Sequence, residues 1–149
     1  MTCLITWSCY AAHITYHPHE PVMHWRRTHC RYPPFVLDRR CREHVLDAIL
    51  QHCRTSDYSL LAVHVRETHV HLIASHTDNP YRLCAALKSH TARRLRQTAS
   101  LPERRPVWAD YRNIRRLPTR ESILKALEYV VEKQGRPMAL WRIPSTAFI

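Results

Sequence analysis

Two apolar runs separated by two polar residues restrict the fold of this chain more than any other feature. The run from Tyr58 to Val65 is followed by Arg66 and Glu67, and then by a second run from Thr68 to Ser75. Both runs are short, contain β-branched residues and are bounded by polar residues, as strands are. Because a two-residue connection joins adjacent antiparallel strands, we expect a β-hairpin here, with the run from Tyr58 to Val65 as a central strand.

The rest of the 149 residues divides into segments of helical or strand pattern. Asp38 and Asn79 are good helix N-caps, Pro80 suits a first helical turn, and Gly135, the chain's one glycine, suits a helix end. The predicted elements are a strand over 4–11, a helix from Arg39 to about Arg54, the hairpin, a helix from Pro80 to about Arg96, a strand from Val107 to Ile114 and a helix that starts after Thr119 and ends at Gly135. A hairpin is also expected around Val22 to Tyr32.

This order predicts an α+β domain, a ferredoxin-like split βαβ antiparallel sheet with helices on one face. The domain is expected to span residues 1–135, and residues 136–149 to form a C-terminal tail. The apolar stretch 4–12 has no basic leader and is interrupted by polar residues, which argues against a signal peptide or membrane span.

The charge of the chain indicates a polyanionic partner. Lys and Arg number 23 against 12 Asp and Glu, a net charge of +11, and only three of the basic residues are Lys. Arginine makes planar, bidentate contacts to phosphate. The six cysteines contain no Cys-x-x-Cys pair, so we expect unpaired thiols and a cytoplasmic, nucleoid-associated protein.

His69 and His71 lie two residues apart on the second hairpin strand. Side chains alternate along a strand, so both imidazoles share one face while Val70, Leu72 and Ala74 share the other. That spacing allows both rings to reach one metal ion. Because the chain has 12 histidines, about one His-x-His is expected by chance, and His17-Pro18-His19 is a second instance without a strand pattern.

Tyr129 lies on the polar side of the third predicted helix. The apolar residues Ile123, Leu124, Leu127, Val130 and Val131 form one stripe at helical spacing, and Tyr129 falls almost opposite it. The tyrosine is therefore not needed in the core, and either a surface role or a chemical one is open to it. A phenol with its ordinary pKa of about 10 needs a metal ion or a base to become a nucleophile.

A strand with His69-Val70-His71, an arginine-rich segment over 107–116 and a helix with Tyr129 together resemble the single-tyrosine HUH transposases. This superfamily includes the small insertion-sequence TnpA transposases and the REP-associated tyrosine transposases. The resemblance implies a metal-dependent enzyme that cuts and rejoins single-stranded or hairpin DNA. Tyr129 would be the nucleophile, and His69 and His71 would hold Mg²⁺ or Mn²⁺. The resemblance leaves open whether the protein is a monomer or a homodimer.

The third metal ligand in that family is usually a polar residue one turn after the tyrosine, and here Lys133 stands at that position. A protonated lysine cannot be a ligand. The candidates are Gln134, which a distorted last turn or a π-bulge would bring into line, and Glu132. We predict Gln134.

DNA binding is predicted for basic clusters, with Trp108 and Tyr111 available to stack on bases. The arginines proposed for phosphate contact are Arg93, Arg94, Arg96, Arg104, Arg105, Arg112, Arg115 and Arg116. Filling of the core is an alternative role for Trp108.

Two other functions are compatible with the sequence. A domesticated or inactive relative would bind hairpin DNA or RNA without cutting it. A structural zinc module would use His24, His29 and Cys30, although the paired ligand spacing of such modules is missing.

Overall fold

The computed structural model describes residues 1–12, 30–75 and 78–148. The elements in chain order are β1 (Cys3–Cys9), α3 (Arg39–Arg54), β2 (Ser59–Val65), β3 (His69–Ser75), α4 (Pro80–Thr98), β4 (Trp108–Arg116), α5 (Arg120–Glu132), β5 (Ala139–Arg142) and the 3₁₀ helix η1 (Ser145–Phe148). The hairpin predicted around Val22 to Tyr32 falls mainly outside the described residues, as do His17, His19, His24 and His29.

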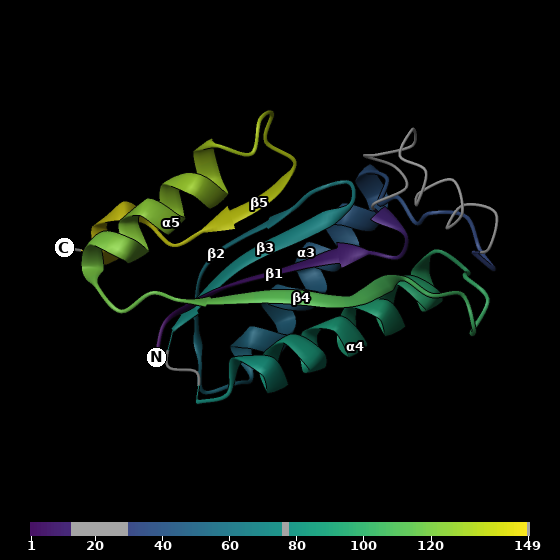
Figure 1. Ribbon diagram of the computed structural model, residues 1–149, viewed down its shortest axis with the longest axis horizontal. Coiled ribbons are helices and arrows are strands. Elements are labelled where there is room, and N and C mark those ends of the chain that lie inside the picture. The colour runs from purple at the N-terminus through teal and green to yellow at the C-terminus, as the bar shows by residue number, and fades with distance from the viewer. Residues whose placement is uncertain (13–29, 76–77, 149) are drawn as a thin grey trace.

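The strands form one antiparallel sheet in the order β4-β1-β3-β2-β5 (Figure 1). The predicted hairpin is present: β2, predicted as a central strand, lies between β3 and β5, and β3 is at the centre of the sheet. Asp38 caps α3, Asn79 caps α4 and Thr119 caps α5, each through its side chain. The predicted α+β class and the predicted order of elements are confirmed.

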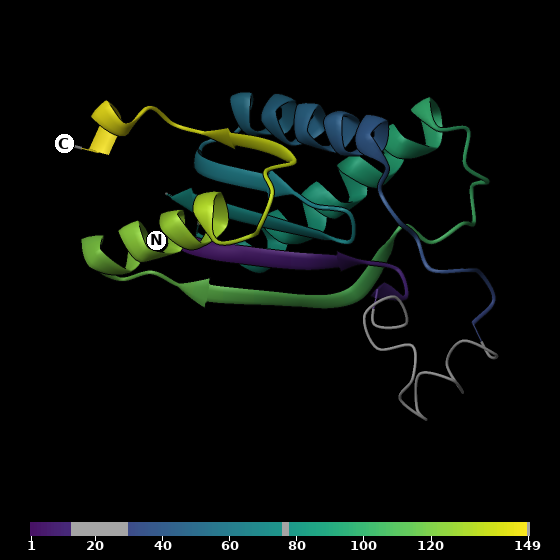
Figure 2. The ribbon, with the colours of Figure 1, turned by 90° about the horizontal axis from the view of Figure 1, so that it is seen from above.

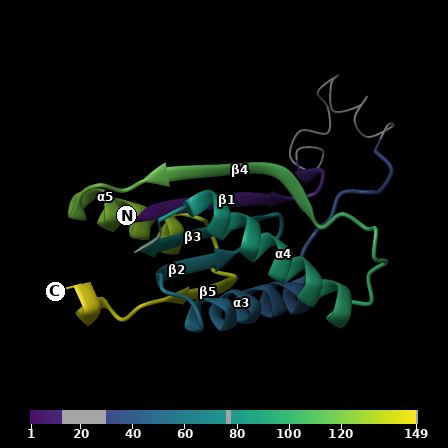
Figure 3. The ribbon, with the colours of Figure 1, turned by 90° about the horizontal axis from the view of Figure 1, so that it is seen from below.

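The sheet is covered on both faces, which corrects the expectation of helices on one face. α3 and α4 pack side by side on one face, as Figure 3 shows, and cover the main core around Ile5, Trp7 and Leu72. α5 lies on the opposite face (Figure 2) and buries Ala126, Leu127 and Val130 there. The reason is that Leu4, Ala62 and Ile73 give the second face an apolar patch of its own, which needs a cover.

The C-terminal segment, predicted as a tail, contributes a strand to the sheet. β5 pairs with the outer side of β2, with Ala62 beside Arg142 and Val65 beside Ala139. Four residues with one aromatic side chain carry too weak a pattern for a strand to be predicted from sequence.

The end of α5 also differs from its prediction. The helix ends at Glu132, before Gly135, which adopts a positive φ of 79° in the following turn. Glycine adopts this conformation at little cost. The chain therefore turns sharply between α5 and β5, and this turn contains Gln134.

Among the described residues, no helix is long and apolar enough to cross a bilayer.

Candidate active site

A row of polar side chains crosses the sheet on the face that α5 covers. Asn113 of β4 pairs with Thr6 of β1. Thr6 pairs on its other side with His71 of β3, which in turn pairs with His64 of β2. Directly paired residues point their side chains to the same face, about 5 Å apart. These four residues, which we call the polar row, bring together segments that are distant in the sequence.

His69 and His71 lie on the same face of β3, as strand alternation predicts, and their rings are nearly parallel. Their centroids are 6.3 Å apart and their planes differ by 7°. Nδ1 of His69 lies 2.8 Å from the hydroxyl oxygen of Thr68, and Nδ1 of His71 lies 3.1 Å from that of Thr6. A hydroxyl at one ring nitrogen orients an imidazole, as the outer contacts of metal-bound histidines do.

The environment of His71 keeps this imidazole neutral. Burial lowers its pKa to about 4, the nearby His69 and Arg66 act in the same direction, and a hydrogen bond with Gln134 acts against them. A neutral imidazole is the form that binds a metal ion. A base with a pKa near 4 is too weak to deprotonate a phenol effectively at neutral pH. His71 is thus suited to hold an ion, and it is a poor general base.

Tyr129 lies beside His71 in the same chain. The two rings meet edge to face, with centroids 5.8 Å apart and planes at 82°. Tyr129 is 42% exposed, whereas the next residue, Val130, is fully buried under the helix. A cavity of about 220 Å³ at this point is lined by Leu4, Thr6, His71, Asn113, Arg115 and Tyr129. The phenol therefore borders a polar cavity that is open to a substrate.

Gln134 and Glu132 point to different places. The amide of Gln134 donates to the carbonyl oxygen of Tyr129 over 3.1 Å, and its side chain also bonds to His71. Glu132 lines a separate hollow together with Arg142 and Ser145. Gln134 reaches the site because α5 has already ended at Glu132, and the described helix contains no π-bulge.

The donor atoms near His71 fit a divalent ion. His69 and His71 offer imidazole nitrogens, and Gln134 offers an amide oxygen, a ligand type that Mg²⁺ and Mn²⁺ accept. Three protein donors leave positions for water and for a phosphate oxygen. A carboxylate or thiolate is missing from this set: in the part of the chain that the structure describes, no three or more His, Cys, Asp or Glu side chains could hold one metal ion.

A sequence profile of the IS200-like transposases matches residues 26–114, which is more than half of the chain. The chain belongs to the IS200-like transposase family. This match confirms the family that the sequence resemblance indicated. The matched residues include His69 and His71 but not Tyr129. No curated protein is significantly similar in sequence.

Two solved structures share the fold of this IS200-like transposase. One is a protein assigned as a transposase from Deinococcus radiodurans R1, with 14% identity, a TM-score of 0.57 and coverage of 87% of this chain and 88% of that chain. The other is a REP-associated tyrosine transposase bound to a REP hairpin, with 11% identity and a TM-score of 0.52. That match covers 89% of this chain and 65% of the other chain.

Three of the eight arginines predicted to bind DNA donate hydrogen bonds within the IS200-like transposase fold. Arg94 donates to Asp47 over 2.8 Å and also to Gln51, which ties α4 to α3. Arg96 donates to the carbonyl of Arg105. The guanidinium of Arg105 donates to the carbonyl of Pro33 and lies over nearby aromatic rings. The guanidinium groups of these three arginines are therefore engaged in hydrogen bonds within the protein.

The other five are divided between the two faces of the sheet or lie away from it. Arg115 lines the cavity beside Tyr129. Arg112 and Arg116 alternate to the α4 face, where Arg112 stacks over Tyr81 at 5.0 Å. Arg93 on α4 and Arg104 in the segment before β4 are exposed. Among the eight, Arg115 is the one that the fold brings to the Tyr129 cavity.

The two aromatic residues predicted to stack on bases have different surroundings. The indole N–H of Trp108 donates to the carbonyl of Lys88 and to Thr91, and its ring packs edge to face on Trp7 at 5.9 Å. Trp108 is thus a packing residue of the α4 face. Tyr111 is 63% exposed.

Sequence reasoning did not identify three members of the polar row: Thr6, Asn113 and His64. Alternation along β1 gave a signal for Thr6, because Ile5 and Trp7 are apolar and Thr6 between them is polar. Asn113 stands among exposed residues of β4, and His64 stands in an apolar run. Only strand pairing places these two beside Thr6 and His71.

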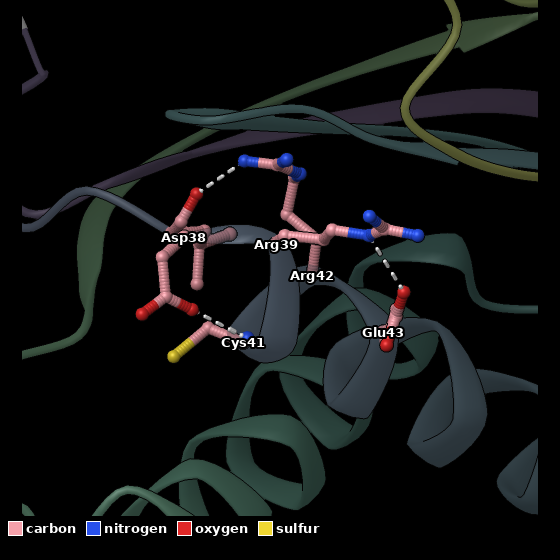
Figure 4. A network of polar contacts seen from close by, with 6 residues as sticks. Asp38, Arg39, Cys41, Arg42 and Glu43 are labelled. Carbon is pink, nitrogen blue, oxygen red and sulfur yellow. Dashed lines mark hydrogen bonds and ion pairs between the residues drawn. The ribbon is translucent and has the colours of Figure 1, made fainter.

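A larger hollow, of about 570 Å³, lies at the start of α3. It is lined by Arg39, Arg42, Glu43, Glu67, Arg136, Pro137, Met138 and Ala139. Figure 4 shows that Arg39 pairs with Glu43. The guanidinium of Arg42 donates to the carbonyl of Leu37. With two of the three arginines engaged and two carboxylates present, this hollow has little surplus charge for a phosphate, and we assign no site to it.

Proposed function

We propose that the protein is a metal-dependent transposase that nicks and rejoins single-stranded DNA, with Tyr129 as the nucleophile. The observation that carries this proposal is the position of the phenol, edge-on to His71 at 5.8 Å and bordering a polar cavity in the same chain. Membership in the IS200-like transposase family and the fold shared with a tyrosine transposase support it.

In the proposed reaction, the phenolic oxygen of Tyr129 attacks the scissile phosphorus. A bond from this oxygen to phosphorus forms while the bond from phosphorus to the 3′ oxygen breaks. The products are a 5′-phosphotyrosine and a free 3′-hydroxyl. The phenol loses one proton, and the leaving 3′ oxygen gains one. Because the covalent link retains the phosphodiester energy, a second DNA end reverses the step without ATP.

The residues around the phenol have separate roles in this proposal. His69, His71 and Gln134 would hold Mg²⁺ or Mn²⁺, which when bound stabilises negative charge on a non-bridging phosphate oxygen. Thr6 and Thr68 orient the two imidazoles through the contacts at Nδ1. Arg115 supplies a cation at the cavity for the phosphate.

The test is to incubate the protein with labelled single-stranded DNA hairpins from its own genomic flanks and Mn²⁺, and to run a denaturing gel. A protein-linked band that is lost in Tyr129→Phe is expected. Tight binding without any band would contradict the cutting activity and would favour a relative that binds hairpins without cleavage.

A further inference from the structure

His64 of β2 is fully buried beside the candidate active site. It pairs directly with His71 across β2 and β3 and shares the polar row with it. Its ring does not line the cavity that contains Tyr129. Instead, both of its ring nitrogens contact backbone atoms of the C-terminal part of the chain.

These two contacts define the state of the imidazole. Nδ1 lies 2.9 Å from the carbonyl oxygen of Val130, and Nε2 lies 3.0 Å from the amide nitrogen of Met138. A carbonyl only accepts and an amide N–H only donates, so the ring is neutral, with its proton on Nδ1. Both nitrogens are bonded to backbone groups, and the ring does not line the cavity, so we do not count His64 among the proposed metal ligands.

The two backbone groups enclose the residues that the proposed reaction needs. Val130 follows Tyr129 and lies in the last turn of α5, where carbonyls run out of helical donors. Met138 comes directly before β5. Gln134 lies between them, and Arg66, two residues after His64, donates to the carbonyl of Arg136 in the same turn. One imidazole thus holds both ends of the segment 130–138 against β2.

Apolar packing alone fixes this segment poorly. α5 buries Ala126, Leu127 and Val130 on a small patch of the sheet. Such contacts are not directional, and they tolerate a small rotation or slide of the helix. Hydrogen bonds require defined angles and distances, so they select one position. A shift of about 1 Å in a reacting group can cost on the order of a hundredfold in rate.

We propose that His64 is a positioning residue, which fixes the end of α5 and the following turn so that Tyr129 and Gln134 meet His71. This inference rests on the proposed function. It predicts that the ring acts through its two hydrogen bonds, and that its loss affects the rate of the covalent step more than the affinity for DNA.

The experiment compares His64→Leu, which removes both bonds at similar volume, with His64→Gln, which retains one donor and one acceptor. Ile49→Ala, in the core on the opposite face of the sheet, is the control for general destabilisation. The readouts are the rate of adduct formation at saturating DNA, the Kd for DNA, and amide hydrogen exchange over residues 130–138.

For His64→Leu we expect an adduct rate lower by about thirtyfold or more, with the Kd unchanged within about twofold and faster exchange over 130–138. His64→Gln should recover a large part of the rate, and Ile49→Ala should stay within about threefold of the native rate. A native rate in His64→Leu, or equal losses in His64→Leu and Ile49→Ala, would overturn the positioning role.

The native protein provides a test that needs no variant. The amide of Met138 should exchange slowly because its N–H donates a hydrogen bond to His64 in the fold. Rapid exchange at Met138 would overturn the inference even if His64→Leu failed to fold. Absence of any adduct in the native protein would instead contradict the proposed function. Because exchange at Met138 does not depend on DNA cleavage, it tests the role of His64 separately from the proposed function.

Discussion

The ring of Tyr129 meets His71 edge to face at 5.8 Å, and this contact joins α5 to the centre of the sheet. A phenylalanine ring can keep the same contact, so Tyr129→Phe removes the hydroxyl and little else. We expect its free energy of unfolding to stay within about 0.5 kcal/mol of the native value and its Kd for DNA to stay within about twofold. Urea unfolding and fluorescence anisotropy measure both. A large loss of binding would mean that the hydroxyl contacts DNA before the reaction.

Replacing both His69 and His71 by alanine should remove the metal site. Two of the three proposed ligands are lost, so Mn²⁺ affinity should fall by about a hundredfold or more, and adduct formation should become undetectable with or without added metal. Calorimetric titration with Mn²⁺ measures the affinity. His44→Ala, a histidine on α3 over the other face, is the control and should bind Mn²⁺ as the native protein does. Unchanged binding in the double variant would place the ion elsewhere.

Gln134→Ala and Glu132→Ala should differ in their effect on metal binding. Gln134 bonds to His71 and to the carbonyl of Tyr129, whereas Glu132 lines a separate hollow. We expect Mn²⁺ affinity to fall by about tenfold in Gln134→Ala and to stay within about twofold in Glu132→Ala. The reverse result would transfer the ligand role to Glu132.

Arg115→Gln and Arg116→Gln form a matched pair, because neighbouring strand residues point to opposite faces of the sheet. Arg115 lines the cavity of Tyr129, and Arg116 does not. Arg115→Gln should weaken binding of single-stranded DNA and lower the slope of log K against log salt by about 0.7. Arg116→Gln should change neither by much. Equal changes would show that DNA contacts both faces of β4.

Arg94→Ala should affect stability and leave DNA binding intact. Arg94 bridges α4 to Asp47 and Gln51 of α3, with its side chain 22% exposed. Only the Arg94 side chain of this pair is partly buried, so its loss should cost at most about 1 kcal/mol of unfolding free energy, while Arg93→Ala at an exposed position should cost less than about 0.5 kcal/mol. Urea denaturation of both variants measures the difference. A DNA affinity that falls in Arg94→Ala with no loss of stability would restore its predicted contact with phosphate.

Much of the local structure follows from the sequence alone. The hairpin of β2 and β3, the caps Asp38 and Asn79, and the shared face of His69 and His71 depend on side chains within a few residues of one another. Alternation along a strand and rotation along a helix express such short-range relations directly. For the same reason, the exposure of Tyr129 was predictable from the stripe opposite it.

The tertiary structure decided what depends on segments far apart in the chain. No local pattern shows that α5 crosses to the second face of the sheet, or that His64 holds the segment that contains Gln134. The same applies to arginines: neighbouring Arg115 and Arg116 are alike in sequence, and the pairing of β4 with β1 gives only Arg115 a place beside Tyr129. The physical reason is that pairing and packing bring residues together through space, whereas a sequence pattern shows only which face of its own helix or strand a side chain occupies.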